Sequence, residues 1–260
     1  MNPIVDVPPA DLNVANARAD ALEEQMAREL DEIVVKSILY QSGEIDPALP
    51  RPQPSGEKTS GRRFLMREDP RLQKMPERPT LIDFFRYRFG SAAHLLQSAR
   101  LALRNGLPEK TVLACLLHDI GVFGLIRSDH GYWGAQLIEP YVDEEVSWAV
   151  RAHQALRFYP DEAVGYLYPE AYIRFFGPDY RPDPYIDRAY QAARQHRWYM
   201  TARLVTLNDF YAFDPDLSVD IEEFTDIIGR HFRQPEEGLG MDNSRASHMW
   251  RTIIAPTRFL

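Results

Sequence analysis

The sequence predicts an all-α fold, and three observations carry that prediction. Apolar residues recur at intervals of three to four through most of the chain. Residues typical of helix starts and ends bracket these segments. Strand-like alternation of apolar and polar residues is almost absent, and there is no internal repeat. A chain of 260 residues is long enough for one large domain, or for one domain with an appended arm.

Composition excludes several classes of protein. The hydrophobic fraction of 45% and the charged fraction of 26% are ordinary for a globular protein, and no apolar run is long enough to cross a membrane. The start of the chain does not look like a secretory signal, so we expect a cytoplasmic protein. The net charge of −8 argues against a nucleic-acid partner. Cys115 is the single cysteine, which excludes a disulfide framework and a thiolate zinc cluster.

The first 79 residues are expected to form an arm and a connector. Residues 11–40 carry apolar side chains at helical spacing and predict one long amphipathic helix. We expect this helix to pack on the main domain or on a second subunit, which leaves a homodimer open. Residues 42–79 are rich in proline, glycine and serine and predict an extended connector. The expected domains are therefore 1–79 and 80–260.

The main domain is predicted as a series of helices with recognisable boundaries. Thr80 is a plausible N-cap with an acidic residue in the first turn, and Ser91 is expected to cap the next helix. Asn105-Gly106 ends that helix, and Pro108 begins another that leads to His118. The core face of the helix after Ser91 is expected to comprise Leu95, Leu96, Ala99, Leu101 and Leu103. The remaining helices are expected at about 131–141, 144–153, 184–213 and 220–232.

The stretch Leu113–Gly121 organises this domain. A run of apolar residues leads directly into His118 and Asp119, and Gly121 follows. Adjacent helical residues project about 100° apart, so both side chains reach one point only if it lies near the end of the helix. A neutral imidazole and a carboxylate are preferred ligands of Fe, Mn and Zn. The pair therefore predicts a metal site, although an isolated His-Asp pair is usually a surface feature.

Further candidate ligands come from other predicted helices, as expected of a metal site in a helical core. One carboxylate that bridges would let the whole set hold two ions. Asp119 is the expected bridge. The full predicted ligand set is His94, His118, Asp119, His130, His153 and Asp209.

We assign His94, His118 and Asp209 to one ion, and His130 and His153 to the other. Asp214 is a rival to Asp209, but it precedes a proline and is typical of a helix end. A capping or surface role is the alternative for His130. The remaining histidines, His196, His231 and His248, are expected at the surface or in packing.

The order of these ligands resembles the HD-domain superfamily of metal-dependent proteins, over about residues 91–214. Many HD phosphohydrolases hold one ion with the first His, the His-Asp pair and the last Asp. With the additional His130 and His153, the ligand set is similar to that of the dinuclear branch, which includes hydrolases and mixed-valent di-iron oxygenases. Among the latter are myo-inositol oxygenase and the phosphonate-cleaving oxygenases. The resemblance implies two Fe ions, with Mn, Zn or Mg as alternatives.

The same resemblance implies residues that handle the substrate. In the phosphonate-cleaving enzymes a Lys four positions after the fourth His holds the anionic group, and Arg157 stands at that place here. An Arg keeps the charge and adds bidentate geometry suited to phosphonate or carboxylate. Arg157 and Tyr159 are expected to bind substrate, with Asp119 and Arg157 as the catalytic residues. The aromatic segment from Tyr159 to Tyr185 is expected to exclude bulk water.

Three functions are compatible with this pattern. The resemblance favours an oxygenase that cleaves a C–C or C–P bond of a small hydroxylated substrate with O2. A metal-dependent phosphohydrolase that acts on a nucleotide or phosphomonoester is the first alternative. It is slightly disfavoured because the residues after Asp119 lack the Lys common in hydrolytic and inositol-oxidising relatives, which removes one phosphate-binding group. A non-catalytic HD binding module is the second alternative, and six buried polar residues speak against it.

Overall fold

The computed structural model describes residues 73–89, 92–124, 129–167, 179–210 and 216–255, together with Ala21, Ala212 and Asp214. Within this part of the chain the fold is all-α, and its β structure amounts to one isolated bridge between Asp161 and Tyr166. No helix in these residues is both long and apolar enough to span a membrane. The predicted N-terminal helix and most of the connector lie outside the described residues, and the domain boundary at residue 79 stays a prediction.

The described residues fall into two compact units. The first spans Ala92–Arg233. It contains α4 (Ala93–Arg104), α5 (Glu109–Leu117), α6 (Ile120–Gly124), α7 (His130–Ile138), α8 (Glu144–Leu156), η1 (Glu162–Val164), α10 (Pro184–Arg194), α11 (Tyr199–Phe210), η2 (Ile221–Phe224) and α12 (Thr225–His231).

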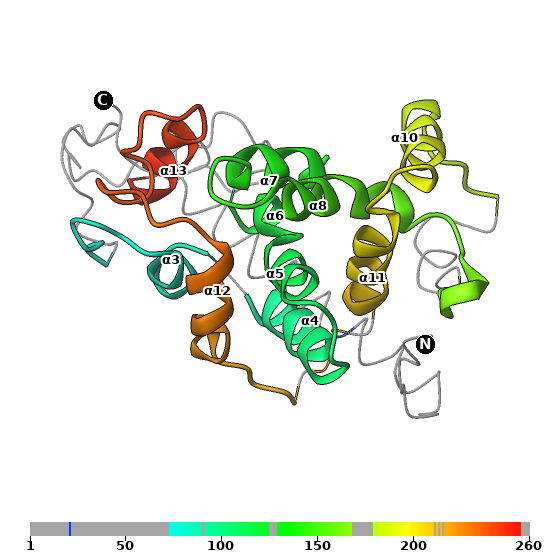
Figure 1. Cartoon of the computed structure of the whole chain (residues 1–260), viewed down its shortest axis with the longest axis horizontal. Coiled ribbons are helices and arrows are strands. Elements are labelled where there is room, and N and C mark those ends of the chain that lie inside the picture. Colours follow the sequence, from blue (N-terminus) through cyan, green and yellow to red (C-terminus); the bar gives the residue numbers. More distant parts are fainter. Residues whose placement is uncertain are drawn as a thin grey trace, which may run out of the picture. The chain divides into compact units, whose positions relative to one another are not determined.

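Helix α5 is the centre of the first unit (Figure 1). Every residue from Thr111 to Leu117 is buried, as expected of a helix that is apolar on all sides. It packs against α4, α8, α11 and α12, and α8 packs in turn against α7 and α11. This arrangement brings the C-terminal end of α5 into the interior, where the His118-Asp119 pair follows.

The second unit contains α3 (Leu81–Tyr87) and α13 (Ser247–Ile254). Thr80 caps α3 as predicted: its hydroxyl accepts from the Asp83 backbone N–H, while the Asp83 carboxylate accepts from the Thr80 backbone N–H at 2.7 Å. Phe84 of α3 packs edge-on against Trp250 of α13, with ring centroids 4.5 Å apart. Both side chains are fully buried, so this aromatic contact forms the core of the unit.

The prediction of one helix over 184–213 is wrong. The chain leaves helical geometry between α10 and α11, at residues 195–198, where the sequence has neither glycine nor proline. The break is held by side chains. The Trp198 backbone N–H donates to His196 Nδ1, and the His196 ring stacks on Trp148 of α8 with centroids 3.9 Å apart. Tertiary packing therefore overrides a local sequence that favours a continuous helix.

Two smaller expectations also need correction. The core face of α4 does not include Leu103, which is 40% exposed, while Leu96 and Leu101 are only half-buried. The helix instead buries Gln97 and Ser98, because the Gln97 side chain donates to the backbone carbonyls of Asp214 and Leu217. Helix α8 continues past His153 to Leu156. The predicted cap Ser91 lies outside the described residues.

Candidate metal centre

The first unit gathers all the predicted ligands at one buried place. His118 is the C-cap of α5, and Asp119 follows it just before α6 begins. The remaining ligands come from α4, α7, α8 and α11. The exposed fractions are 1% for His94, 0% for His118, 7% for Asp119, 7% for His130, 0% for His153 and 2% for Asp209. Helices distant in sequence thus deliver imidazoles and carboxylates to one point, which is how helical cores build metal sites.

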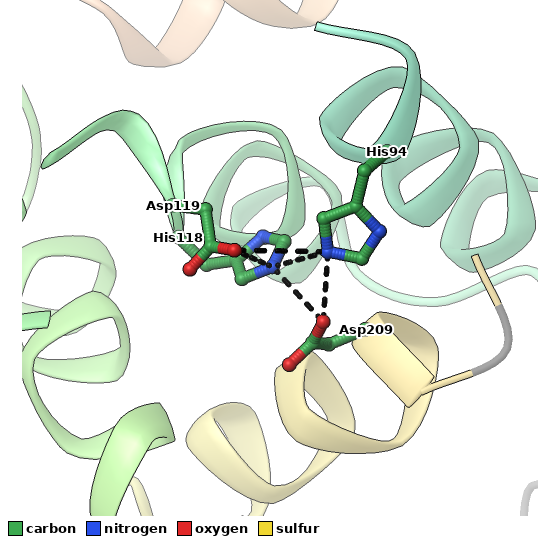
Figure 2. A group of neighbouring side chains, drawn as sticks. All are labelled: His94, His118, Asp119 and Asp209. Carbon is green, nitrogen blue, oxygen red and sulfur yellow. Dashed lines mark hydrogen bonds and ion pairs between the residues drawn. The ribbon is translucent and has the colours of Figure 1, made fainter. Parts of the chain in front are cut away.

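Four of these side chains form the first cluster, drawn in Figure 2. Asp209 Oδ1 lies 2.8 Å from His94 Nε2 and 3.4 Å from His118 Nε2. Asp119 Oδ2 lies 3.8 Å from His94 Nε2 and 3.7 Å from His118 Nε2. The ligand atoms all lie within 4.8 Å of one another, so this cluster could hold a metal ion.

The second cluster comprises Asp119, His130 and His153. Here the other carboxylate oxygen, Asp119 Oδ1, lies 3.1 Å from His130 Nε2 and 3.4 Å from His153 Nε2. The Asp119 carboxylate therefore turns one oxygen to each cluster. The geometry is compatible with the bridge predicted for this residue, whose role as a ligand stays a prediction.

The histidine rings are oriented by backbone carbonyls. The Nδ1 atoms of His118 and His153 lie 2.6 Å from the carbonyls of Cys115 and Val150, and His94 Nδ1 lies 3.1 Å from Ala212 O. A carbonyl can only accept, so these Nδ1 atoms carry the proton. The lone pair of a neutral ring is then on Nε2, which faces the cluster. Metal-bound histidines commonly donate their other ring N–H to a backbone carbonyl in this way.

The facing nitrogens provide a test of whether a cation fits. His94 Nε2 lies 3.1 Å from His118 Nε2, and His130 Nε2 lies 3.2 Å from His153 Nε2. Two lone pairs at such a distance repel unless a proton or a metal ion lies between them. In addition, Asp119 Oδ1 and Asp209 Oδ1 are buried carboxylate oxygens without a hydrogen-bond partner of good geometry. The residues present fit a cation in each cluster.

The pKa values of the clustered histidines and carboxyls also indicate that the centre favours positive charge. Burial by itself lowers the pKa of His118, but the carboxylates of Asp119 and Asp209 outweigh burial and raise it to about 9. Burial opposes ionisation of those two carboxyls, yet nearby positive groups hold the pKa of each well below its usual range. Burial lowers the pKa of His153 to about 4. The centre therefore favours ionised carboxylates and at least one positive charge.

The two predicted substrate residues differ in position. Arg157, the C-cap of α8, has its Nε 3.4 Å from Asp209 Oδ2, so its charge lies beside the first cluster. Tyr159 stacks on Tyr190 of α10 with centroids 3.8 Å apart, and its hydroxyl donates to Asp187 Oδ1. Burial and this carboxylate raise the pKa of Tyr159 to about 12. The structure brings Arg157 to the centre and places Tyr159 against α10.

The rival residues take other roles. The Asp214 carboxylate accepts a hydrogen bond from the backbone N–H of Asp216, while its own backbone N–H donates to Gln97 Oε1. His196 stacks on Trp148, and His231 Nε2 lies 2.8 Å from Glu109 Oε2. Asp214 and these histidines belong to neither cluster.

Sequence reasoning missed Arg203, which is fully buried in α11. Its Nη1 donates to the backbone carbonyls of Leu156, the last residue of α8, and of Tyr159, three residues further on. The one signal in the sequence is a charged residue within the apolar run Ala202–Val205, and a buried arginine needs partners to satisfy its charge.

Comparison with known proteins agrees with this geometry. Residues 91–197 match the family model of the HD domain. A curated relative from Leisingera caerulea is 36% identical over 78 residues, which cover 26% of this chain and 40% of that protein. It is a 1-hydroxy-2-(trimethylamino)ethylphosphonate dioxygenase, described as glycine-betaine-forming. The match spans less than half of that relative. Together, the helical fold, the buried His/Asp clusters and the match over residues 91–197 identify an HD domain in this chain.

Proposed function

We propose that the centre binds two metal ions bridged by Asp119, and that the protein is a di-iron oxygenase. The main observation behind this proposal is that the two oxygens of the Asp119 carboxylate face different clusters. Oδ2 lies toward His94 and His118, and Oδ1 lies toward His130 and His153. Asp209 completes the first set. Neutral imidazoles and carboxylates suit redox-active iron, with Mn, Zn or Mg as alternatives.

The proposed reaction is oxidative cleavage of a C–P bond in a small 1-hydroxyalkyl phosphonate. Such a substrate and O2 give a carboxylate and phosphate, so that both oxygen atoms enter the products. The activity of the relative supports this class, because the substrate of that enzyme carries a hydroxyl and a phosphonate on one carbon and its product is glycine betaine. Cleavage of a C–C bond in a hydroxylated substrate is the analogous alternative.

The residues of the chain have distinct proposed roles. Bound iron would supply the activation of O2 and Lewis acidity toward the substrate hydroxyl. Arg157 binds the anionic group of the substrate, and its contact with Asp209 Oδ2 fixes that charge beside the first cluster. The stacked Tyr159 and Tyr190 rings pack the segment that follows Arg157, and in this way they help this segment to exclude water from the site.

The test is iron quantification together with an EPR spectrum of protein produced in iron-rich medium and partly reduced with ascorbate. We expect about two irons per chain and a spin-one-half signal from a coupled Fe(II)/Fe(III) pair. Addition of 1-hydroxyalkyl phosphonates should perturb that signal and release phosphate in an O2-dependent manner. Two bound Mn or Zn ions with no such signal, together with phosphomonoester hydrolysis, would contradict the proposal and indicate a phosphohydrolase.

A further inference from the structure

The guanidinium of Arg203 binds the backbone on both sides of Arg157. Nη1 donates to Leu156 O at 3.0 Å and to Tyr159 O at 3.1 Å. Nε donates to the Tyr199 hydroxyl at 3.1 Å and lies 3.8 Å from Asp161 Oδ2. Because a buried charge is unfavourable without partners, this set of contacts strongly restricts where the guanidinium can lie.

Of the two carbonyls that it binds, Leu156 O belongs to the last residue of α8 and Tyr159 O lies three residues further on, and this helix end has no glycine. The last carbonyls of an α-helix lack partners within the helix, and a left-handed glycine commonly supplies the turn that satisfies them. Here the C-cap is Arg157 in right-handed helical geometry. The carbonyl of Arg157 itself accepts from the buried Tyr166 hydroxyl at 2.8 Å. Side chains from outside α8 therefore add to the backbone hydrogen bonds at this end of the helix, in which the Arg157 N–H donates to His153 O and the Tyr159 N–H donates to Leu156 O.

Helix α11 contacts this segment along one face. Arg203, Thr206 and Asp209 are spaced by three residues, so each is a neighbour of the next on the surface of the helix. The single O–H of Thr206 is shared between Ala202 O at 3.1 Å and His153 O at 3.3 Å, and Asp209 Oδ2 lies 3.4 Å from Arg157 Nε. Helix α11 thus holds the backbone on either side of Arg157 through Arg203, and it contacts the Arg157 side chain through Asp209.

We propose that Arg203 is a positioning residue that sets the geometry with which Arg157 binds the anionic group of a substrate. This inference rests on the proposed function for the site occupied by Arg157. Arg203 acts through the backbone of residues 156–159 and does not itself contact the substrate. A phosphonate or carboxylate needs a guanidinium in a defined orientation, because bidentate pairing depends on the directions of two N–H groups.

The experiment measures binding of methylphosphonate to the metal-loaded protein by calorimetry, with metal content and the melting temperature recorded for every variant. Arg203→Lys keeps the charge but loses the fork that reaches two carbonyls and a hydroxyl. We expect it to raise the Kd for methylphosphonate by about tenfold, with metal content unchanged. Tyr166→Phe removes only the donor to the Arg157 carbonyl and should raise the Kd by about threefold. Arg197→Lys, at a side chain that is 68% exposed, is the matched control and should leave it unchanged.

A double-mutant cycle separates positioning from a general structural effect. In an Arg157→Met background, Arg203→Lys should no longer change the Kd, because both substitutions remove the same interaction. Additive effects would overturn the inference, as would an unchanged Kd in Arg203→Lys or no methylphosphonate binding by the unmodified protein. If Arg203→Lys fails to fold or loses metal, Tyr166→Phe decides, and an unchanged Kd in that variant overturns the inference. Failure of the proposed function is read separately, from the iron content and the EPR signal.

Discussion

Asp119 is the residue on which the two halves of the candidate centre depend. Its Oδ1 lies 3.1 Å from His130 Nε2, and its Oδ2 lies 3.7 Å from His118 Nε2. No other described side chain belongs to both clusters. A substitution of Asp119 should therefore affect metal binding by both clusters, whereas a substitution of a ligand in one cluster should affect that cluster alone.

Replacement of one second-cluster ligand should remove one ion only. We expect His130→Ala to hold about one metal per chain in place of two, with its helical content retained. Asp119→Asn should weaken both sites, because the amide loses the charge that each ion needs. Metal per chain, measured by mass spectrometry after gel filtration, checks both expectations. The exposed His248→Ala is the control, and two ions retained in His130→Ala would contradict the second-site assignment.

The sequence identifies some site residues more readily than others. His118 and Asp119 are adjacent and end an apolar helix, so their chemistry is visible without a structure. Arg203 is not recognisable in this way, because its partners are backbone carbonyls at the end of α8 rather than side chains with a spacing of their own. A residue that acts on the backbone of a distant segment has no partner spacing in the sequence, and the charge within an apolar run is the one signal that it leaves.

The approach of α6 to α7 depends on Gly121. A Cβ built there would lie 2.7 Å from the backbone carbonyl of His130 and 3.1 Å from Gly134 N. Both contacts are with backbone, which cannot move away as the end of a side chain can. Any side chain at this position must displace the first turn of α7, which carries His130.

Gly121→Ala should therefore affect both stability and metal content. We expect a loss of about 1–3 kcal/mol in the free energy of unfolding and reduced occupancy of the second cluster. Gly229→Ala in α12 is the matched control, because a Cβ there meets nothing within 4 Å. That control should be neutral or stabilising by about 0.5–1 kcal/mol. Urea unfolding and metal analysis of both variants check this, and equal behaviour of the two would refute the close-approach argument.

Helices α5 and α12 are joined by an ion pair that should depend on pH. Arg230 binds the Glu109 carboxylate through Nε and Nη2, and His231 Nε2 contacts it as well. Hydrogen bonds from Arg230 first, then from His231, lower the pKa of Glu109 from 4.5 to about 2. A lowered carboxyl pKa means that this contribution to stability is complete above pH 4.5 and is lost as the pH falls toward 2.

The measurement is the urea midpoint of the metal-free protein between pH 6 and pH 2, for the unmodified chain and for Glu109→Gln. The difference between the two midpoints should be largest at pH 6 and should shrink as the pH falls below 4.5. Glu162→Gln, at an exposed glutamate of η1, should show no such difference. A difference for Glu109→Gln that does not change with pH would exclude the ion pair as its cause. High salt should reduce it, because the pair is exposed.

Helix boundaries were predictable where the residues that start or end the helix lie next to it in the sequence. Thr80 and Asp83 form the capping pair expected at the start of α3, and α4 ends at Asn105-Gly106 with Gly106 at a φ of 64°. The break between α10 and α11 was not predictable, because it depends on Trp148, which lies in a different helix. Contacts across the core decide such features, and a single sequence does not display them.

At the scale of the whole molecule, bound ions should contribute to folding stability. The unit formed by Ala92–Arg233 buries four histidines and two carboxylates that are close to one another. An ion that binds only the folded chain stabilises it, by about 4 kcal/mol when its concentration is a thousand times its Kd. We expect removal of metal with a chelator to lower the melting temperature by several degrees. Calorimetry with and without chelator, followed by re-addition of iron, checks this. An unchanged melting temperature in protein shown to have lost its metal would contradict it.

The carbonyls that hold the imidazoles also bear on which ions the centre accepts. His118 and His153 each bind a carbonyl three residues earlier in the chain, so a local turn of backbone fixes the ring before any ligand arrives. The rotational freedom of these rings is given up when the chain folds, and binding does not have to remove it again. Rings held in this way also cannot retreat to make room. The centre should therefore discriminate by ionic radius as well as by ligand chemistry, and reject Ca²⁺, which takes six to eight oxygen ligands in a larger shell.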